Sequence, residues 1–153
     1  MGEVPHDRGL DQQLFGREVP EHGADPDAGP ARGQADKLAE FYAEETDVRH
    51  PMAPLGDTPL LTREAVRQHF AAAGRGGLAG FRVEDVRVHH TADPEVVIGE
   101  FTYRGDAGWA APGIIVFRIR DGLIVESRDY IDHLGLARAT NTVDALCAQL
   151  TNA

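Results

Sequence analysis

An Asp-Gly pair between two strand-like runs constrains this fold more than any other part of the sequence. The run Gly113–Ile119 is almost wholly apolar and is soon followed by Asp121-Gly122, after which strand-forming residues resume. Asp-Gly readily adopts the positive φ angles of a two-residue turn, so this pattern predicts a β-hairpin. Alternation along its second strand predicts one face made of Leu123, Val125, Ser127, Asp129 and Ile131.

Asp129 is unusual on this face because most of its neighbours are apolar. If the face lines the interior, a carboxyl group lies on an apolar wall, and burying it costs free energy unless it is paired. Two interpretations remain open. Asp129 is either a structural acid that pairs with Arg104 or Arg49, or a functional group.

Helix-like segments precede most of the strand-like segments. Thr62–Ala73 begins with an N-cap threonine and stops at glycine, which predicts a helix, and a second helix is expected over Ala35–Ala43. Thr46–Met52 alternates like a strand and stops at a proline. The other expected elements are strands at Phe81–Thr91, Val96–Arg104, Trp109–Arg120 and Leu123–His133 and helical spacing from Leu136 to Leu150. The short turns predict an antiparallel meander, and the order of elements predicts an α+β fold with helices on one face of the sheet.

Composition limits the number of domains and the partners. A chain of 153 residues fits one domain, with residues 1–34 as an irregular Gly- and Pro-rich arm and residues 35–153 as the folded unit. The net charge of -10 with no basic run argues against nucleic acid and anionic membranes. A single cysteine, Cys147, excludes an intrachain disulfide, and no signal peptide or membrane-spanning segment is evident. We expect a cytoplasmic protein.

Four strings in sequence order resemble a known superfamily. They occupy residues 41–51, 62–66, 96–101 and 121–130, so the likeness spans about residues 35–135. The pattern resembles the ketosteroid-isomerase and nuclear-transport-factor-2-like superfamily, particularly its SnoaL-like polyketide-cyclase branch. This resemblance implies a cone-shaped curved antiparallel sheet with helices packed on one face around a deep apolar pocket. The fold hosts isomerases, cyclases, epoxide hydrolases, dehydratases and inert binders, so the site must decide the function.

Strand alternation predicts which side chains line this pocket. We expect Asp129, Glu100 and His50 to converge there as catalytic groups. Adjacent His89 and His90 point to opposite faces of a strand, so no metal site is expected. The expected substrate-binding residues are Tyr42, Met52, Thr102, Arg104, Trp109, Ala111, Gly113, Ile115 and Phe117.

These residue types suit general acid/base catalysis without a cofactor. Burial raises the pKa of a carboxyl group and a nearby second carboxylate raises it further, while a histidine can carry a proton or hold a substrate oxygen. The sequence therefore predicts a cofactor-independent cyclase or isomerase of a mid-sized apolar, polyketide-like metabolite. Each residue also has a structural interpretation: Glu100 can pair with Arg104, His50 can be a strand-end histidine, and Trp109 and Phe117 can be plain core.

Two alternative functions remain. Limonene-type epoxide hydrolases of this superfamily carry an Arg-x-Asp on the middle strand and an Arg-Asp-Tyr on the last. Here Arg128-Asp129-Tyr130 matches the last element, but Glu100-Phe101-Thr102 replaces the middle one. An epoxide-opening enzyme with an altered site is therefore one alternative, and a non-catalytic small-molecule binder is the other.

A homodimer is expected through the back of the sheet. Strand alternation places Phe101, Tyr103, Ile114 and Val116 on the outer face, where they form an apolar patch larger than a monomer normally exposes. The superfamily resemblance implies the same association.

Overall fold

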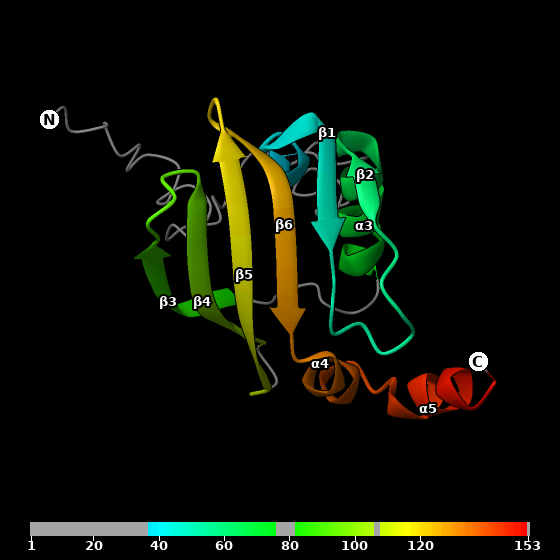
Figure 1. Cartoon of the computed structure of the whole chain (residues 1–153). Helices are drawn as coiled ribbons and strands as arrows, with labels where there is room; N and C mark the ends of the chain where they lie inside the picture. The colour runs from blue at the N-terminus through cyan, green and yellow to red at the C-terminus, as the bar shows by residue number, and fades with distance from the viewer. Residues whose placement is uncertain (1–36, 76–81, 106–107, 153) are drawn as a thin grey trace, which may run out of the picture.

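The computed structural model describes residues 37–75, 82–105 and 108–152, and the predicted arm at residues 1–34 lies outside these ranges. Six strands form one sheet in the order β2-β1-β6-β5-β4-β3, and α3 packs against β1 and β2 (Figure 1). The α+β class is confirmed. The elements are β1 (Tyr42–Arg49), β2 (Leu60–Thr62), α3 (Arg63–Arg75), β3 (Arg82–His90), β4 (Val96–Arg104), β5 (Ala110–Arg120), β6 (Leu123–Ile131), α4 (His133–Ala139) and α5 (Val143–Thr151).

The predicted hairpin is present. Asp121 and Gly122 have φ angles of 52° and 75°, as a two-residue turn of this kind requires, and they join β5 to β6. β3 to β6 pair with their sequence neighbours as an antiparallel meander. In this register Ile115 lies opposite Asp129, so both side chains project from the same face of the sheet.

The sheet is mixed, because β1 pairs in parallel with β6. The predicted helix over Ala35–Ala43 extends too far toward the C-terminus, since Tyr42 already belongs to β1. Tertiary pairing overrides the helical pattern: Ile124 donates its amide hydrogen to the Phe41 carbonyl at 2.8 Å, and Tyr42 is 5% exposed. β2 was not predicted, because three residues after a Pro-rich loop give too little periodicity to detect.

β4 faces the opposite way from the prediction. Its residues pair directly with β5, Phe101 opposite Gly113 and Gly99 opposite Ile115, so the odd-numbered side chains lie on the Asp129 face. Phe101 fills the space above Gly113, where a Cβ atom would lie 2.7 Å from the Phe101 ring. Burying this ring requires the neighbouring Glu100 to lie on the other face, together with Thr102 and Arg104.

A β-bulge in β6 corrects the predicted face near the turn. Phe117 pairs with Ser127, but Ile119 pairs with Ile124, so β6 contains one extra residue in this interval. The bulge turns Ile124 inward, where it is completely buried, in place of the expected Leu123 and Val125. The Thr46 hydroxyl on β1 donates to the backbone carbonyls of Ile124 and Val125, at 3.4 and 3.2 Å.

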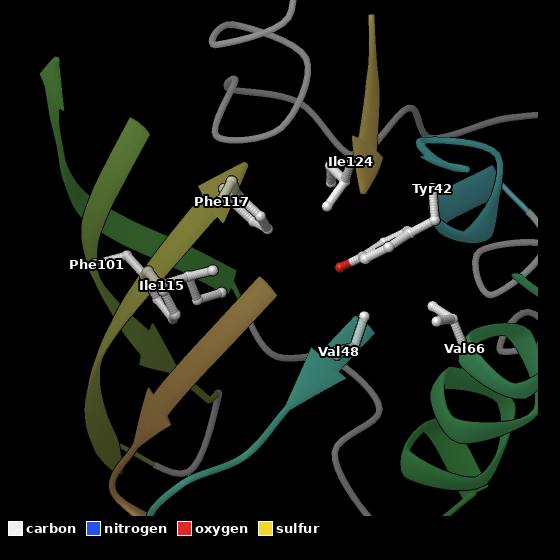
Figure 2. Close-up of a cluster of buried hydrophobic side chains, with 7 residues drawn as sticks. All are labelled: Tyr42, Val48, Val66, Phe101, Ile115, Phe117 and Ile124. Atoms are coloured by element: carbon white, nitrogen blue, oxygen red, sulfur yellow. The ribbon is translucent and has the colours of Figure 1, made fainter. Parts of the chain in front are cut away.

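The core lies between the sheet and α3. Figure 2 shows its members projecting toward one another, with the Tyr42 hydroxyl directed into the middle of the group. Phe101 also stacks edge-to-face on Tyr103 at 4.7 Å between ring centroids. Both aromatic residues therefore belong to the interior, and their predicted place on the back of the sheet is wrong. The buried cluster is Tyr42, Val48, Val66, Phe101, Ile115, Phe117 and Ile124.

The C-terminal segment forms two helices in place of one continuous helix. Asn141 has a φ of 55°, which interrupts the helical path between α4 and α5. Asp132 caps α4 by accepting the Gly135 amide hydrogen at 2.8 Å. α5 contains no buried residue, and both helices lie beyond the end of β6 at the edge of the molecule (Figure 1). No helix in the described part of the chain is long and apolar enough to cross a membrane.

Candidate active site

Asp129 is a buried carboxyl group on the inner face of β6. It is 7% exposed, and the completely buried Ser127 donates its hydroxyl hydrogen to the Asp129 carboxylate from the same strand face. Burial raises the pKa of Asp129 to about 6, because the charged form loses hydration. The Ser127 hydrogen bond and the charges of His69 and Arg128 oppose this effect. Near neutral pH the group can therefore both accept and donate a proton.

The structural interpretation of Asp129 required Arg104 or Arg49 as its partner, and both arginines bind other carboxylates. Arg49 binds Asp47 at 2.7 Å and lies 3.8 Å from Asp57. Arg104 lies on the back of the sheet and binds Glu84 and Asp85, each at 3.0 Å. Among the described residues, the ion-pair partner within 4 Å of Asp129 is a histidine. A carboxyl group whose pKa is raised by burial is common at functional sites.

His50 is that histidine. It follows the last residue of β1, and its Nε2 atom lies 3.9 Å from Asp129 Oδ2. The turn after β1 holds it in place, because the His50 amide donates to the Asp57 carboxylate at 2.9 Å. Burial lowers the pKa of His50, and the charge of His133 lowers it further. The imidazole is therefore mostly neutral near pH 7 and can exchange a proton with the carboxyl group.

Two further histidines join this group, and neither was predicted. His69 on α3 stacks on His50 with 4.8 Å between ring centroids. The pKa values of His69 and His133 are both lowered, first by loss of hydration, and His50 adds to the effect at His69. His69 lies three residues after the buried Val66, so helical spacing places both on the inner side of α3. That spacing was the available signal for His69.

Two tyrosines face the same carboxyl group. Burial raises the pKa of Tyr42 well above its ordinary value, and the Asp129 charge adds to the effect. The same two causes, burial first, raise the pKa of Tyr103. Both phenols therefore stay protonated at physiological pH and can donate hydrogen bonds. Tyr42 was expected to bind substrate, whereas Tyr103 was expected on the outer face.

Several predicted site residues lie away from Asp129. Glu100 is on the opposite face of the sheet, where its carboxylate lies 3.1 Å from His89 Nε2, and Thr102 and Arg104 share that face. Met52 is 64% exposed, because β1 ends before Pro51 and the chain turns away. These four placements correct the prediction of one converging pocket wall.

The residues of the predicted pocket wall on β5 lie on the predicted face, but neighbouring side chains pack against them. Ala111, Ile115 and Phe117 are buried, and Phe101 occupies the space above Gly113. Trp109 precedes β5, and its indole lies against Gly105, which follows β4. These side chains therefore pack against their neighbours on this side of the sheet.

The arrangement suits proton transfer. A carboxyl oxygen and an imidazole nitrogen 3.9 Å apart can both reach a single atom of a bound molecule, and two protonated phenols lie on the same side. The described residues contain no group of three or more His, Cys, Asp or Glu side chains placed to hold a metal ion.

Comparison with known proteins assigns the chain to a family. Residues 28–127 match the model of the SnoaL-like domain. The chain belongs to the SnoaL-like family. This family is part of the nuclear-transport-factor-2-like superfamily, in agreement with the resemblance seen in the sequence. No curated protein matches this SnoaL-like chain.

Solved structures share the fold of this SnoaL-like domain at low sequence identity. A Bacillus subtilis protein proposed to be an isomerase is 22% identical with a TM-score of 0.62, covering 73% of this chain and 84% of its own. A proposed polyketide cyclase from Xanthomonas campestris pv. campestris is 18% identical with a TM-score of 0.56, covering 86% and 94%. The epoxide hydrolase/cyclase-like enzyme SalBIII is 16% identical with a TM-score of 0.53, covering 69% and 83%. These similarities establish the fold.

The raised pKa of Asp129 predicts a specific pH dependence of stability. A folded-state pKa of about 6 against 3.8 means that the folded protein binds this proton more tightly, so the associated stability is present below pH 3.8 and is lost as the pH rises through 6. An asparagine side chain in its place does not titrate. The unfolding free energy of Asp129→Asn relative to the wild type is therefore expected to increase by roughly 2 to 3 kcal/mol between pH 4 and pH 8.

Urea unfolding at several pH values measures this difference. Taking the variant relative to the wild type cancels the opposite pH dependence of the histidines. Asp144→Asn, at an exposed position on α5, is the matched control and should leave the difference flat. A flat difference for Asp129→Asn as well would show that Asp129 has an ordinary pKa.

Proposed function

We propose that this protein is a cofactor-independent isomerase or cyclase that acts on a mid-sized, apolar, polyketide-like metabolite by general acid/base catalysis. The observation that carries the proposal is the buried Asp129 carboxyl, which has a pKa of about 6 and lies 3.9 Å from His50 without an arginine partner. A base is most effective when its pKa lies near the working pH, and Asp129 meets this condition. The single exposed cysteine fits a cytoplasmic site of action.

The proposed reaction moves one proton. The Asp129 carboxylate removes a proton from a carbon next to a substrate carbonyl, which leaves an enolate. The phenols of Tyr42 and Tyr103 and the His50 imidazole stabilise the enolate oxygen by hydrogen bonding. The enolate then either accepts the proton back at another carbon, which isomerises the substrate, or forms a carbon–carbon bond to an internal carbonyl, whose oxygen takes the proton from Asp129. Glu100 was expected to be the partner of Asp129, but it lies on the far face of the sheet. His50 is therefore the partner of Asp129 in this mechanism.

The similar structures support this class of chemistry. One is proposed to be an isomerase, and another a polyketide cyclase. SalBIII has a role in pyran ring formation in the polyether salinomycin. All three descriptions concern rearrangement or ring closure on the same fold.

The raised pKa also favours a second candidate reaction, in which an epoxide is opened by an internal hydroxyl. Protonated Asp129 would donate its proton to the epoxide oxygen while the hydroxyl attacks carbon and gives up its own proton, which restores the acid. Water labelled with ¹⁸O separates the possibilities. Internal closure and isomerisation incorporate no label, whereas hydrolysis incorporates one labelled oxygen.

The activity test uses a panel of enone- and epoxide-bearing polyketide intermediates. If Asp129 is the base for isomerisation, kcat/KM for the enone substrates should rise with pH through about 6, since the active form is the carboxylate. Asp129→Asn should lower kcat by about 10²- to 10⁴-fold. Glu126→Gln, on the exposed face of the same strand, is the control and should retain activity. Equal activity in Asp129→Asn would show that Asp129 is not the base, whereas saturable binding that is independent of pH and without turnover would favour the non-catalytic binder.

We also propose a homodimer through the back of the sheet. The side chains of Ile114 and Tyr130 are 42% and 41% exposed there and border a hollow of about 580 Å³. Arg87 and Glu100 on the same surface supply both signs of charge, which lets the surface pair with a second copy of itself. Light scattering should give twice the chain mass for the wild type and the monomer mass for Ile114→Glu. A monomeric wild type at micromolar concentration would contradict the proposal.

A further inference from the structure

A groove beside the histidine group is built mainly by the two C-terminal helices. It has a volume of about 400 Å³, within the range of about 300 to 1,000 Å³ usual for small-molecule sites. Of its ten lining residues, eight lie between positions 133 and 149, beyond the part of the chain that matches the family model. The other two come from α3 and from the turn after β1. Its apolar lining residues are Pro54, Ala73, Leu136, Ala137, Ala145 and Leu146.

The groove carries no formal charge, although the protein has a net charge of -10. None of its ten lining residues is Asp, Glu, Lys or Arg. The titratable member is His133, and burial lowers its pKa, so it is mostly neutral near pH 7. Thr140, Thr142 and Gln149 add neutral polar groups. A charged molecule would lose hydration in this groove without gaining a partner, so the lining favours a neutral ligand.

The groove adjoins the candidate active site through His133. This residue lines the groove, and its charge acts on both His50 and His69, of which His50 lies 3.9 Å from Asp129. His133 Nε2 is also buried and has no hydrogen-bond partner among the described residues. The position next to β6 explains the arrangement, because α4 begins two residues after the strand that carries Asp129.

We propose that this groove binds a neutral, mainly apolar arm of the substrate whose reacting part lies at Asp129. This inference rests on the proposed function and adds a substrate class to it: an elongated neutral molecule with a hydrocarbon ring or chain on the α4–α5 side of its reactive carbonyl. Because most of the groove comes from α4 and α5, beyond the residues that match the family model, it selects the substrate of this chain, while β6 and the end of β1 supply the acid and its histidine partner.

The test compares the same substitution on two faces of α5. Ala145→Trp places an indole in the groove, whereas Ala148→Trp places it on an exposed position outside the lining. The probe is Nile red, a neutral apolar dye that reports binding by fluorescence. We expect one saturable site per chain in the wild type and in Ala148→Trp. Ala145→Trp should weaken dye binding at least tenfold.

Additional variants assign the dye to the groove and separate this inference from the proposed function. Asp129→Asn should keep dye binding, and Ile114→Trp should keep it if the dye does not occupy the back of the sheet. With ¹³C-labelled histidine, the NMR signal of the His133 ring should shift on dye binding, and Ala145→Trp should abolish that shift. Equal dye affinity in the two α5 variants, or loss of binding only in Ile114→Trp, would overturn the inference.

Turnover gives a second readout. If the proposed function holds, Ala145→Trp should raise KM for long substrates while leaving kcat and the KM for short substrates unchanged. Turnover in which both α5 variants match the wild type on long substrates would contradict the groove proposal alone. Dye binding that follows the predicted pattern without turnover of any panel substrate would contradict the proposed function and leave the groove as a ligand site.

Discussion

The free-energy cost of holding the Asp129 carboxyl in the interior is the constraint on which the rest of the site depends. A pKa of about 6 in place of 3.8 corresponds to roughly 3 kcal/mol lost whenever the group is ionised. An arginine partner would remove most of this cost, but Arg49 and Arg104 bind other carboxylates. The fold keeps the group buried and leaves the proton available for transfer. In the proposed mechanism, this loss of stability falls at the position where acid/base chemistry requires a carboxyl that titrates near neutral pH.

The scaffold around Asp129 is assembled from four elements. β6 carries Asp129 and Ser127 on one face, His50 directly follows β1, α3 supplies His69, and α4 begins with His133. The parallel pairing of β1 with β6 brings the first and last strands of the described chain together, so His50 after β1 meets Asp129 on β6. Proton exchange between these groups is possible because burial brings the pKa of Asp129 upward and those of the histidines downward, toward a common range.

Local signals predicted much of the fold, and long-range contacts account for the errors. The Asp121-Gly122 turn and the bounds of β4 follow directly from sequence pattern. The facing of β4 does not, because both of its faces contain apolar residues and the choice depends on Phe101 covering Gly113 from the neighbouring strand. The bulge in β6 likewise depends on a cross-strand register that no single strand reveals.

The candidate site divides along the same line. Asp129 was identifiable because one charged residue interrupted a mostly apolar alternation. His69 and His133 were not identified, because each lies on a different element and only the tertiary fold brings them together. Glu100 was predicted on the wrong face because the inward and outward positions of β4 were assigned the wrong way round. The residue proposed to carry the chemistry was thus recognisable from local sequence, whereas its neighbours depend on the tertiary fold.

The central claim is that Asp129 titrates near neutral pH inside the folded protein, and ¹³C NMR of the aspartate carboxyl carbons measures this directly. The Asp129 signal can be assigned by its absence from the spectrum of Asp129→Asn. We expect a midpoint at about 6 in the folded protein, with the His50 ring titrating below its ordinary range. A midpoint near the ordinary value of 3.8 would contradict it, because a fully ionised, unperturbed carboxylate is neither the buried group described here nor an effective acid at neutral pH.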